Sequence, residues 1–495
     1  SVQTFRNYIA GEFASASGGP TLDVVDPARG EVYAKVARSD ASDVDRAVES
    51  AQRAFPEWRD LGAQERSQRM LALAQRIEDD LERFAHAECV DTGKPIALAR
   101  SVDIPRAVAN FRFFATAILH TETAAHHMDA TPSVGATGGT ALNYTLRSPR
   151  GACGLISPWN LPLYLLTWKI APAIATGNTA VAKPSEVTPA TATLMCEKLD
   201  EADIPPGVLN IVHGMGDECG ATIVEHPDVK AVSFTGSTTV GRWIGETCGR
   251  ALKPVSLELG GKNPTVVFAD ADMDKAIPTS VRAAFANQGQ ICLCGSRILV
   301  EHSVYDEFVR AFVEHTKAIS IGDPLEEGTM HGASVSAPHL EKIERAVERA
   351  RELGGEILTG GRRVDPSSLP ERCKGGYFYE PTVITGLENE CDVIQQEIFG
   401  PVVTIQPFAD EREAVALANS TEYGLAASLW TSDLTRAHRV ASSIDSGIVW
   451  VNCWMLRDLR TPFGGMKSSG VGREGGTEAL RFFTEAKNVC VALER

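Results

Sequence analysis

The sequence predicts an α/β protein, with two doubly wound α/β domains and a small bridging β element. Short apolar strands alternate with helical segments from Gly151 onward, and a second series of this kind runs from Pro264 to about Trp450. This order of elements predicts parallel sheets, because parallel neighbours must be joined by a crossover connection. At 495 residues the chain is too long for one simple core, so two or three domains are expected.

The segments before residue 151 are mainly helical in pattern. Apolar residues recur at three- and four-residue spacing over 41–53 and 63–85, which predicts two amphipathic helices. Further along, Thr188 and Pro189 are expected to open a helix, with threonine as the N-cap and proline in the first turn. The strands predicted for the first series lie at 179–183, 209–212 and 231–234.

Two alternating segments, 140–147 and 488–493, lie outside both series. Their alternation predicts strands. The sequence alone does not assign their partners.

Composition and charge exclude several classes of protein. Apolar residues make up 43% of the chain and charged residues 23%, which is ordinary for a soluble globular protein. The formal net charge of -16 argues against nucleic acid and against anionic membrane surfaces as partners. It also means that an anionic substrate would need a local cluster of arginines.

No segment predicts a membrane span or a metal site. The most apolar run, 161–175, is interrupted by polar residues and prolines, and the N-terminus lacks the pattern of a signal peptide. The eleven cysteines have no regular spacing; the pair Cys292 and Cys294 alone is a poor zinc site. A reducing cytoplasmic location is therefore expected.

The chemistry is concentrated in two motifs. Residues 289–297 (GQICLCGSR) place Cys292 just after a glycine-bearing turn, and residues 257–262 (LELGGK) place Glu258 between two leucines. A thiol and a carboxylate can together form and then hydrolyse a covalent acyl-enzyme. Alternatively, the thiol is an inert core residue and the carboxylate is a buried, structurally paired one.

Together with 158–160 (PWN) and 397–401 (EIFGP), these motifs resemble the aldehyde dehydrogenase superfamily, and the resemblance runs from about Phe5 to the C-terminus. It implies that Cys292 is the nucleophile, because the family spacing selects it over Cys294, and that Glu258 is the general base. Asn160 would form the oxyanion hole with the backbone N–H of Cys292. Lys169 matches a family lysine near the active site, with a structural or a proton-relaying role left open.

The resemblance also implies a division of the chain. Residues 1–124 and 150–256 would form a Rossmann-like NAD-binding domain, and 257–460 the catalytic domain. Residues 125–149 and 476–495 would form an oligomerisation element, so a homodimer or a homotetramer is expected.

The cofactor motif is weak without the resemblance. Residues 214–220 (GMGDECG) follow a strand but hold one residue too many for the usual G-x-G-x-x-G, so an ordinary strand–helix turn remains an alternative. The resemblance implies NAD, with Glu186 on the ribose hydroxyls favouring NAD over NADP and Glu397 on the nicotinamide ribose. The residues expected to contact NAD are Ile156, Ser157, Pro158, Trp159, Lys183, Ser185, Glu186, Gly216, Phe234, Gly236, Ser237, Leu259, Glu397 and Phe399.

Within the superfamily, the chain most resembles the 2-aminomuconic and 2-hydroxymuconic semialdehyde dehydrogenases of aromatic and tryptophan–kynurenine catabolism. The segments that carry this are 103–106, 110–114, 161–169 and 452–460.

This subgroup implies a small anionic semialdehyde whose carboxylate is bound by Arg112 and Arg457, since guanidinium groups match carboxylates in geometry. Alternatively, Arg112 anchors its helix and Arg457 pairs with Asp458 or another neighbour. Two other functions also stay open: oxidation of another small aldehyde, betaine-type or aliphatic, and a non-enzymatic protein on the same fold.

Overall fold

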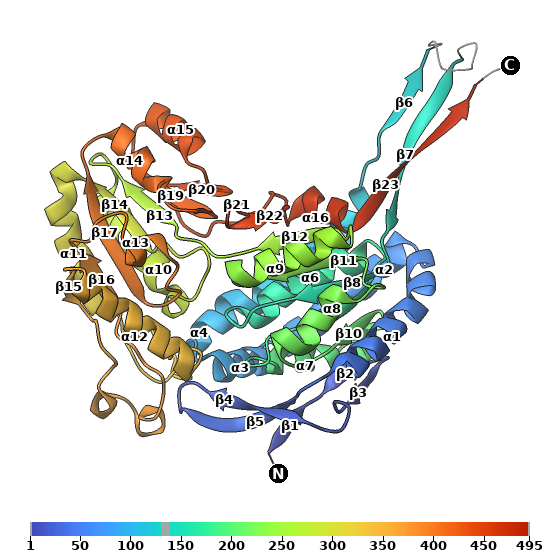
Figure 1. Cartoon of the computed structure of the whole chain (residues 1–495), viewed down its shortest axis with the longest axis horizontal. Helices are drawn as coiled ribbons and strands as arrows, with labels where there is room; N and C mark the ends of the chain where they lie inside the picture. The colour runs from blue at the N-terminus through green and yellow to red at the C-terminus, as the bar shows by residue number, and fades with distance from the viewer. Residues whose placement is uncertain (1, 130–138, 494–495) are drawn as a thin grey trace.

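The computed structural model describes residues 2–129 and 139–493. Two lobes, each built on a large sheet, lie side by side, and a narrow three-stranded arm projects from the first lobe (Figure 1). The two α/β units and the small β element predicted from the sequence are therefore confirmed. The residue limits predicted for the three domains stay predictions.

The first lobe contains an eight-stranded sheet with the order β22-β12-β11-β8-β9-β10-β2-β3. Its five central strands are parallel, as the alternation after Gly151 predicts. They are β8 (Ala152–Ile156), β9 (Thr179–Lys183), β10 (Leu209–Ile211), β11 (Ala231–Thr235) and β12 (Val255–Glu258). The antiparallel edge strands are β2 (Asn7–Ile9), β3 (Glu12–Ala14) and β22 (Gly470–Val471).

The order of these strands creates a switch point beside β8. The chain passes from β8 to β9 and β10 on one side, then returns to β11 and β12 on the other. Ligands of open α/β sheets bind outside the carboxyl ends of the strands at such a point. Ile156 and Thr235 end the two strands that meet there, so the segments that follow them face the crevice.

The helices of the first lobe cover both faces of this sheet. Helix α6 is buried along its whole length, because it lies against β8 and β9 on one side and against α2 and α5 on the other. The helices are α1 (Ala41–Asp60), α2 (Ala63–Asp79), α3 (Leu81–Thr92), α4 (Ile96–Leu98), α5 (Ile104–Ala117), α6 (Pro162–Ala175), α7 (Ala190–Cys196), α8 (Ala221–Glu225), α9 (Thr238–Arg250) and α16 (Gly476–Phe482).

The second lobe contains a seven-stranded sheet with the order β15-β16-β17-β14-β13-β19-β20, parallel except for β15. Its strands are β13 (Pro264–Val267), β14 (Arg297–Glu301), β15 (Glu356–Thr359), β16 (Thr382–Thr385), β17 (Val402–Phe408), β19 (Ala426–Trp430) and β20 (Ile448–Val451). Its helices are α10 (Met273–Phe285), α11 (Tyr305–Lys317), α12 (Ala337–Glu352), α13 (Asp392–Gln395), α14 (Glu411–Ala418) and α15 (Leu434–Ser443).

Two small sheets complete the first and second lobes. One has the order β1-β5-β4, and the other pairs β18 with β21. Their strands are β1 (Gln3–Phe5), β4 (Thr21–Asp26), β5 (Glu31–Ala37), β18 (Tyr423–Gly424) and β21 (Met466–Lys467).

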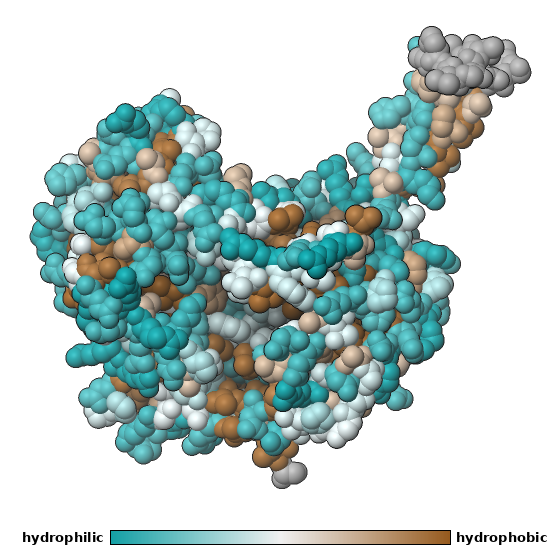
Figure 2. Space-filling view, in the orientation of Figure 1, coloured by the Kyte–Doolittle hydropathy of each residue, from teal (hydrophilic) through white to brown (hydrophobic). Residues whose placement is uncertain are grey.

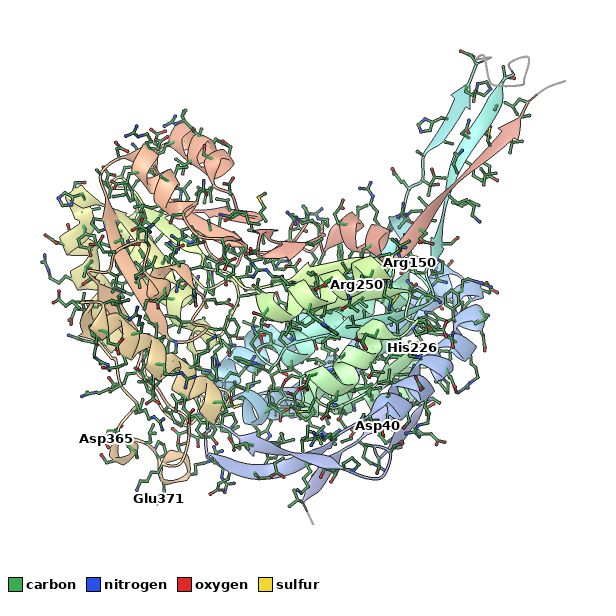
Figure 3. All side chains as sticks on the ribbon, viewed as in Figure 1. Asp40, Arg150, His226, Arg250, Asp365 and Glu371 are labelled. Atoms are coloured by element: carbon green, nitrogen blue, oxygen red, sulfur yellow. The ribbon has the colours of Figure 1, made fainter. Side chains whose placement is uncertain are left out.

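The arm is an antiparallel sheet of β6 (Ala125–Met128), β7 (Ala141–Pro149) and β23 (Thr484–Ala492). The two segments whose partners the sequence left open therefore pair with each other. At its base the Arg150 guanidinium donates to the carbonyls of Phe482 and Thr484, at 2.7 and 3.0 Å (Figure 3). Residues 130–138 and 494–495 of the predicted oligomerisation element lie outside the described residues.

Apolar side chains are exposed along the arm, where Figure 2 shows a brown stripe. Leu142, Leu146 and Val491 are among them. No helix among the described residues is long and apolar enough to span a membrane.

Two local predictions were wrong. The helix predicted over 63–85 is interrupted at Asp80, whose φ of -109° and ψ of 22° are not helical. Thr188 is not an N-cap: α7 begins at Ala190, and the Thr188 hydroxyl is buried without a hydrogen-bond partner among the described residues. Pro189 takes the N-cap position instead, with φ of -87° and ψ of -13°.

Candidate active site

Three segments bring the candidate catalytic side chains together between the lobes. Glu258 ends β12, Asn160 lies in the turn between β8 and α6, and Cys292 lies in the loop that leads to β14. The Asn160 side-chain amide donates to the Gln290 carbonyl at 3.0 Å, so it reaches the cysteine loop rather than its own turn. The carboxylate of Glu258 is close enough to Cys292 to influence the pKa of its thiol.

The loop before Cys292 has an unusual backbone. Asn287, Gln288 and Gly289 are consecutively left-handed, with φ of 53°, 58° and 70°. A Cβ added at Gly289 would lie 2.0 Å from the Gly400 carbonyl oxygen, so only glycine fits there. Backbone strain of this kind persists only where the surrounding structure enforces it, and it is concentrated at functional sites.

Cys292 is half-buried, whereas Cys294 is buried. Burial, with the nearby carboxylates of Glu397 and Glu258, raises the pKa of the Cys292 thiol, and Arg457 opposes this rise. The thiol is therefore protonated at neutral pH and must lose its proton before it can attack. Burial raises the pKa of Cys294 to about 12, and its lower exposure makes it the poorer nucleophile.

Glu258 is a buried carboxylate with both oxygens available. Its side chain is 3% exposed, and neither oxygen has a hydrogen-bond partner among the described residues. Burial and the Glu474 carboxylate raise the pKa of Glu258 well above its usual range, while Lys169 lowers it. A Cβ at Gly464 would lie 2.9 Å from Glu258 Oε1, so the glycine leaves room beside this oxygen. A carboxylate in this state suits proton transfer from water.

Lys169 lies close enough to Glu258 for its charge to lower the pKa of that carboxyl, but its hydrogen bonds go to other residues. Its ammonium donates to Glu474 Oε1 at 2.8 Å and to Ser233 Oγ at 3.0 Å. Its charge therefore limits the rise in the pKa of Glu258.

The carboxyl edge of the first sheet carries polar groups that lack protein partners. The hydroxyls of Ser157, Thr235 and Thr238 are buried and have no hydrogen-bond partner among the residues that the structure describes. Buried hydroxyls are normally satisfied. Helix α9 also starts at this edge, after Ser237, whose Oγ accepts from the Val240 N–H at 3.4 Å. These features fit a phosphate-bearing ligand.

The other predicted cofactor residues lie around the same edge. The ring of Phe234 covers Gly236 so closely that a Cβ there would lie 2.4 Å from the ring. The space beside Gly216 contains no protein atom, since an added Cβ would meet none within 4 Å. Leu259 lies under α9, against Gly241.

Lys183 and Glu186 form an ion pair of 3.3 Å at the end of β9. The Ser185 hydroxyl accepts from the Val187 N–H at 3.4 Å. Glu186 is half-buried, so its carboxylate stays accessible to a ligand in the crevice.

Glu397 and Phe399 approach the site from the second lobe. Glu397 Oε1 accepts from the Gly261 N–H at 3.0 Å. Phe399 is left-handed, with φ of 61°, and its ring meets that of Trp159 edge-on at 5.3 Å. Pro158, next to Trp159, is half-buried, and Ile156 ends the strand before it.

His339 belongs to this aromatic group and was missed from the sequence. Its Nε2–H donates to the Phe399 carbonyl at 2.6 Å, and its ring lies 5.0 Å from that of Trp159. No motif near the start of α12 signals this contact, because the partners come from three distant segments.

The prediction for Arg112 is corrected by the structure. Its guanidinium is bonded to Glu78 and Gln75 of α2, at 2.9 Å to Glu78 Oε1 and 3.0 Å to Gln75 Oε1, and its side chain is 40% exposed. Arg112 therefore ties α5 to α2, the alternative that was left open for it.

Arg106, on the same helix, packs against aromatic residues of α6 instead of pairing with α2. Its guanidinium lies over the rings of Tyr164 and Trp168, 4.6 and 5.0 Å from their centroids. Its Nε–H donates to Asn110 Oδ1 at 2.9 Å, but its Nη2 is buried without a hydrogen-bond partner among the described residues. Burial lowers the pKa of Arg106 to about 10, and Arg457 contributes to this.

Arg457 lies close enough to Arg106 for its charge to lower the pKa of Arg106. Its guanidinium lies 4.2 Å from the ring centroid of Phe463 and 5.9 Å from that of Trp168. Its Nε and Nη2 are buried and unbonded, and neither arginine has an ion-pair partner within the described ranges. Asp458 pairs with Arg460 instead. Two neighbouring guanidinium groups that pair with no carboxylate of the described residues suit an anionic ligand.

Comparison with known proteins identifies the family. The model of the aldehyde dehydrogenase family matches residues 13–489. This chain belongs to the aldehyde dehydrogenase family. Its catalytic chemistry is therefore the oxidation of an aldehyde.

Relatives of this aldehyde dehydrogenase match over nearly the whole chain. A 2-aminomuconic semialdehyde dehydrogenase of Danio rerio is 51% identical, covering 98% of both chains. A 2-hydroxymuconic semialdehyde dehydrogenase of Pseudomonas sp. (strain CF600) is 46% identical over 99% of this chain and 100% of the relative. The NAD+ complex of a Bacillus cereus aldehyde dehydrogenase superimposes with a TM-score of 0.93 at 37% identity, covering 99% and 97%.

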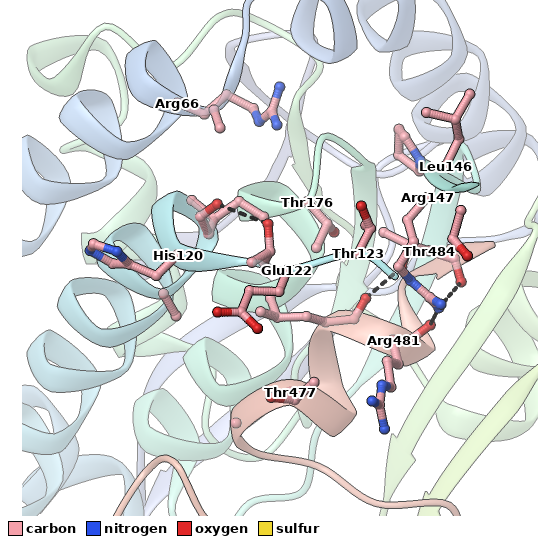
Figure 4. A pocket seen from close by; sticks show the side chains of 18 of the residues that line it. Arg66, His120, Glu122, Thr123, Leu146, Arg147, Thr176, Thr477, Arg481 and Thr484 are labelled. Atoms are coloured by element: carbon pink, nitrogen blue, oxygen red, sulfur yellow. Dashed lines mark hydrogen bonds between the residues drawn. The ribbon is translucent and has the colours of Figure 1, made fainter. Parts of the chain in front are cut away.

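A broad pocket at the base of the arm is separate from this site. Figure 4 shows Arg66, Arg147 and Arg481 around it. Arg147 is bonded to the chain itself, at 2.8 Å to Thr484 Oγ1 and 3.0 Å to the Arg481 carbonyl. None of the candidate catalytic residues lines it, so this pocket is distinct from the candidate active site.

Proposed function

We propose that this enzyme oxidises a small anionic semialdehyde, 2-aminomuconate 6-semialdehyde or its 2-hydroxy analogue, to the dicarboxylic acid with NAD. The observation that carries the proposal is the unpaired couple of Arg106 and Arg457. Both lie on Trp168, and the charge of Arg457 reaches both Cys292 and Glu258. A substrate carboxylate at the arginines would leave its aldehyde end toward the thiol. The names of the relatives from Danio rerio and Pseudomonas support the same substrate class.

The first half of the reaction forms a bond to sulfur. Cys292 loses its proton, and its sulfur attacks the aldehyde carbon. The carbonyl oxygen becomes an oxyanion that accepts from the Asn160 amide and from the Cys292 backbone N–H. Bound NAD supplies the acceptor for the hydride that leaves this carbon. The carbon then remains attached to Cys292 as a thioester.

The second half releases the acid. Glu258 takes a proton from water, and the water oxygen attacks the thioester carbon. The carbon–sulfur bond breaks and Cys292 is regenerated. The net reaction converts aldehyde, water and oxidised NAD to carboxylate, reduced NAD and two protons. The raised pKa of Glu258 and the open space at Gly464 support its role as the base.

The crevice at the switch point supports NAD as the cofactor. Its unpaired hydroxyls and the start of α9 suit the pyrophosphate. The Glu186 carboxylate would accept from the ribose hydroxyls and repel a 2′-phosphate. Glu397, Phe399 and Trp159 would hold the nicotinamide end. The NAD+ complex of the Bacillus cereus neighbour is consistent with this cofactor.

The arm supports a homo-oligomer, dimeric or tetrameric. Its exposed apolar residues, including Leu146 and Val491, would be covered by a second copy of the chain. The net charge of -16 disfavours nucleic acid and anionic membranes as partners. A cytoplasmic location agrees with eleven cysteines that are all free.

A substrate panel tests the proposed function. NAD reduction should be followed with both muconic-type semialdehydes, a betaine-type aldehyde and an aliphatic aldehyde. We expect the highest kcat/KM with the anionic semialdehydes. A higher kcat/KM with the betaine-type or aliphatic aldehyde would refute the proposed substrate. If no aldehyde supported NAD reduction, the proposed dehydrogenase activity would be refuted.

A further inference from the structure

A buried cluster of three charged residues lies behind the turn that carries Asn160. Lys94, Glu88 and Asp103 are each 0% exposed. Lys94 follows the left-handed Gly93 that ends α3, and Asp103 precedes α5. The Lys94 ammonium contacts the Asp103 carboxylate, and it lies 3.7 Å from Glu88 Oε1.

This cluster is not explained by the stability of the fold alone. Buried charges are costly, and apolar residues of similar volume often replace a buried ion pair without loss. Neither oxygen of Glu88 has a hydrogen-bond partner among the described residues. Burial raises the pKa values of both Glu88 and Asp103, and the charge of Lys94 lowers them. Asp103 is the closer of the two carboxylates to the ammonium.

The ammonium of Lys94 makes one further bond, and this bond leads to the active site. It donates to the backbone carbonyl of Asn160 at 3.1 Å. The same carbonyl accepts from Asn287 Nδ2, also at 3.1 Å. Asn287 Nδ2 lies 3.2 Å from the Gln290 carbonyl, and the side chain of Asn160 donates to that carbonyl at 3.0 Å. These hydrogen bonds form a closed ring that joins the turn of Asn160 to the loop of Cys292. Lys94 lies outside the ring and donates to one of its members, the Asn160 carbonyl.

We propose that Lys94 is a positioning residue that holds the Asn160 amide in place to bind the oxyanion. This inference rests on the function proposed above. The lysine reaches no reacting atom; it acts through the carbonyl of Asn160, and Asp103 holds the ammonium in position.

The loss of this anchor should affect the chemical step more than the binding of ligands. Removing one oxyanion donor typically costs about 10²–10³ in rate, and a displaced donor loses part of this. We expect kcat to fall roughly 10- to 100-fold. NAD affinity should stay unchanged, because Lys94 bonds to none of the residues assigned to the cofactor.

The test compares two double variants of the full chain that differ in one donor. Both Lys94→Met/Asp103→Asn and Lys94→Gln/Asp103→Asn replace the ion pair by neutral groups of similar size. Only glutamine can still donate toward the Asn160 carbonyl. We expect kcat to fall 10- to 100-fold in the Met variant and to recover partly in the Gln variant. Glu88→Gln, the control, keeps both bonds of Lys94 and should retain the kcat of the original enzyme.

Thermal unfolding and NAD titration accompany each variant. Equal kcat in the Met and Gln variants, or an unchanged kcat in the Met variant, would show that Lys94 only balances Asp103 and would overturn the proposal. Failure of both double variants to unfold cooperatively would also overturn it, because Lys94 would then be required for folding.

A double-mutant cycle with Asn160→Ala separates this inference from the proposed function. In the Asn160→Ala background, the Lys94→Met/Asp103→Asn change should cost no further activity, because the donor that it positions is already absent. An equal loss in both backgrounds would refute the positioning role while leaving the oxyanion role intact. Full turnover by Asn160→Ala itself would instead refute the oxyanion role in the proposed function.

Discussion

Replacement of Arg106 by methionine tests how this enzyme recognises its substrate. The change removes the guanidinium but keeps a side chain that can lie against Tyr164 and Trp168. We expect KM for a muconic-type semialdehyde to rise strongly. We expect KM for an uncharged aliphatic aldehyde to change little, since it has no carboxylate to lose contact with.

The magnitude follows from the free donors. Arg106 has one buried unbonded group, Nη2, and Arg457 has two, Nε and Nη2. A hydrogen bond to a charged group contributes about 1.5–3 kcal/mol. Loss of the single contact from Arg106 should therefore raise KM about 10- to 150-fold, since 1.4 kcal/mol corresponds to a factor of ten. Arg457→Met removes more donors and should have the larger effect.

Arg112→Met is the matched control, because it removes the same group from the same helix. Its guanidinium is paired with Glu78 at an exposed position, and such pairs contribute about 0–1 kcal/mol to stability. It should leave KM unchanged for both aldehydes. The assay is steady-state NAD reduction with each aldehyde. An equal rise in KM for charged and uncharged substrates would refute the reasoning, and so would an effect of Arg112→Met as large as that of Arg106→Met.

Three further predictions concern the chemistry and the cofactor. Cys292→Ala should abolish turnover while NAD titration stays normal; appreciable NAD reduction by this variant would exclude Cys292 as the nucleophile. Glu258→Gln should reduce NAD in one burst and then accumulate a thioester visible by mass spectrometry. Because the pKa of Glu258 is raised, the hydrolysis rate of the original enzyme should rise with pH beyond the usual range of a glutamate, and a flat profile would contradict its role as base. Glu186→Ser should narrow the preference for NAD over NADP in kcat/KM; an original enzyme that prefers NADP would contradict the assignment.

The sequence could predict the parts of this site that depend on local pattern. Cys292 follows a glycine-bearing turn, and the structure shows why: the left-handed Gly289 lies against the Gly400 carbonyl. Glu258 ends a parallel strand between two leucines, so its burial and its place at the carboxyl edge both follow from the strand pattern. The alternation of strands and helices likewise predicts both large sheets.

The arginine that we propose to bind the substrate could not be identified in the same way. Arg106 and Arg112 are six residues apart on α5 and therefore point about 120° apart around the helix. Both lie near aromatic residues in the sequence, so composition does not separate them. The two arginines are distinguished by which face of α5 packs on α6. Asn110 gives a local indication of this face, because it follows Arg106 by about one helical turn. Its Oδ1 accepts from Arg106, and its Nδ2 donates to the Tyr164 carbonyl of α6.

The net charge of the chain indicates that an anion site needs positive charge, but it does not show which residues supply that charge. A protein with a charge of -16 repels an anionic substrate at long range, so an anion site demands positive charge that is not neutralised nearby. Most arginines here are bonded to carboxylates or carbonyls, as Arg112 and Arg147 are. Arg106 and Arg457 are different because each has a buried nitrogen without a hydrogen-bond partner, and neither makes an ion pair, among the described residues. Leaving such donors unsatisfied costs stability, and a substrate carboxylate that satisfies them would recover this free energy upon binding.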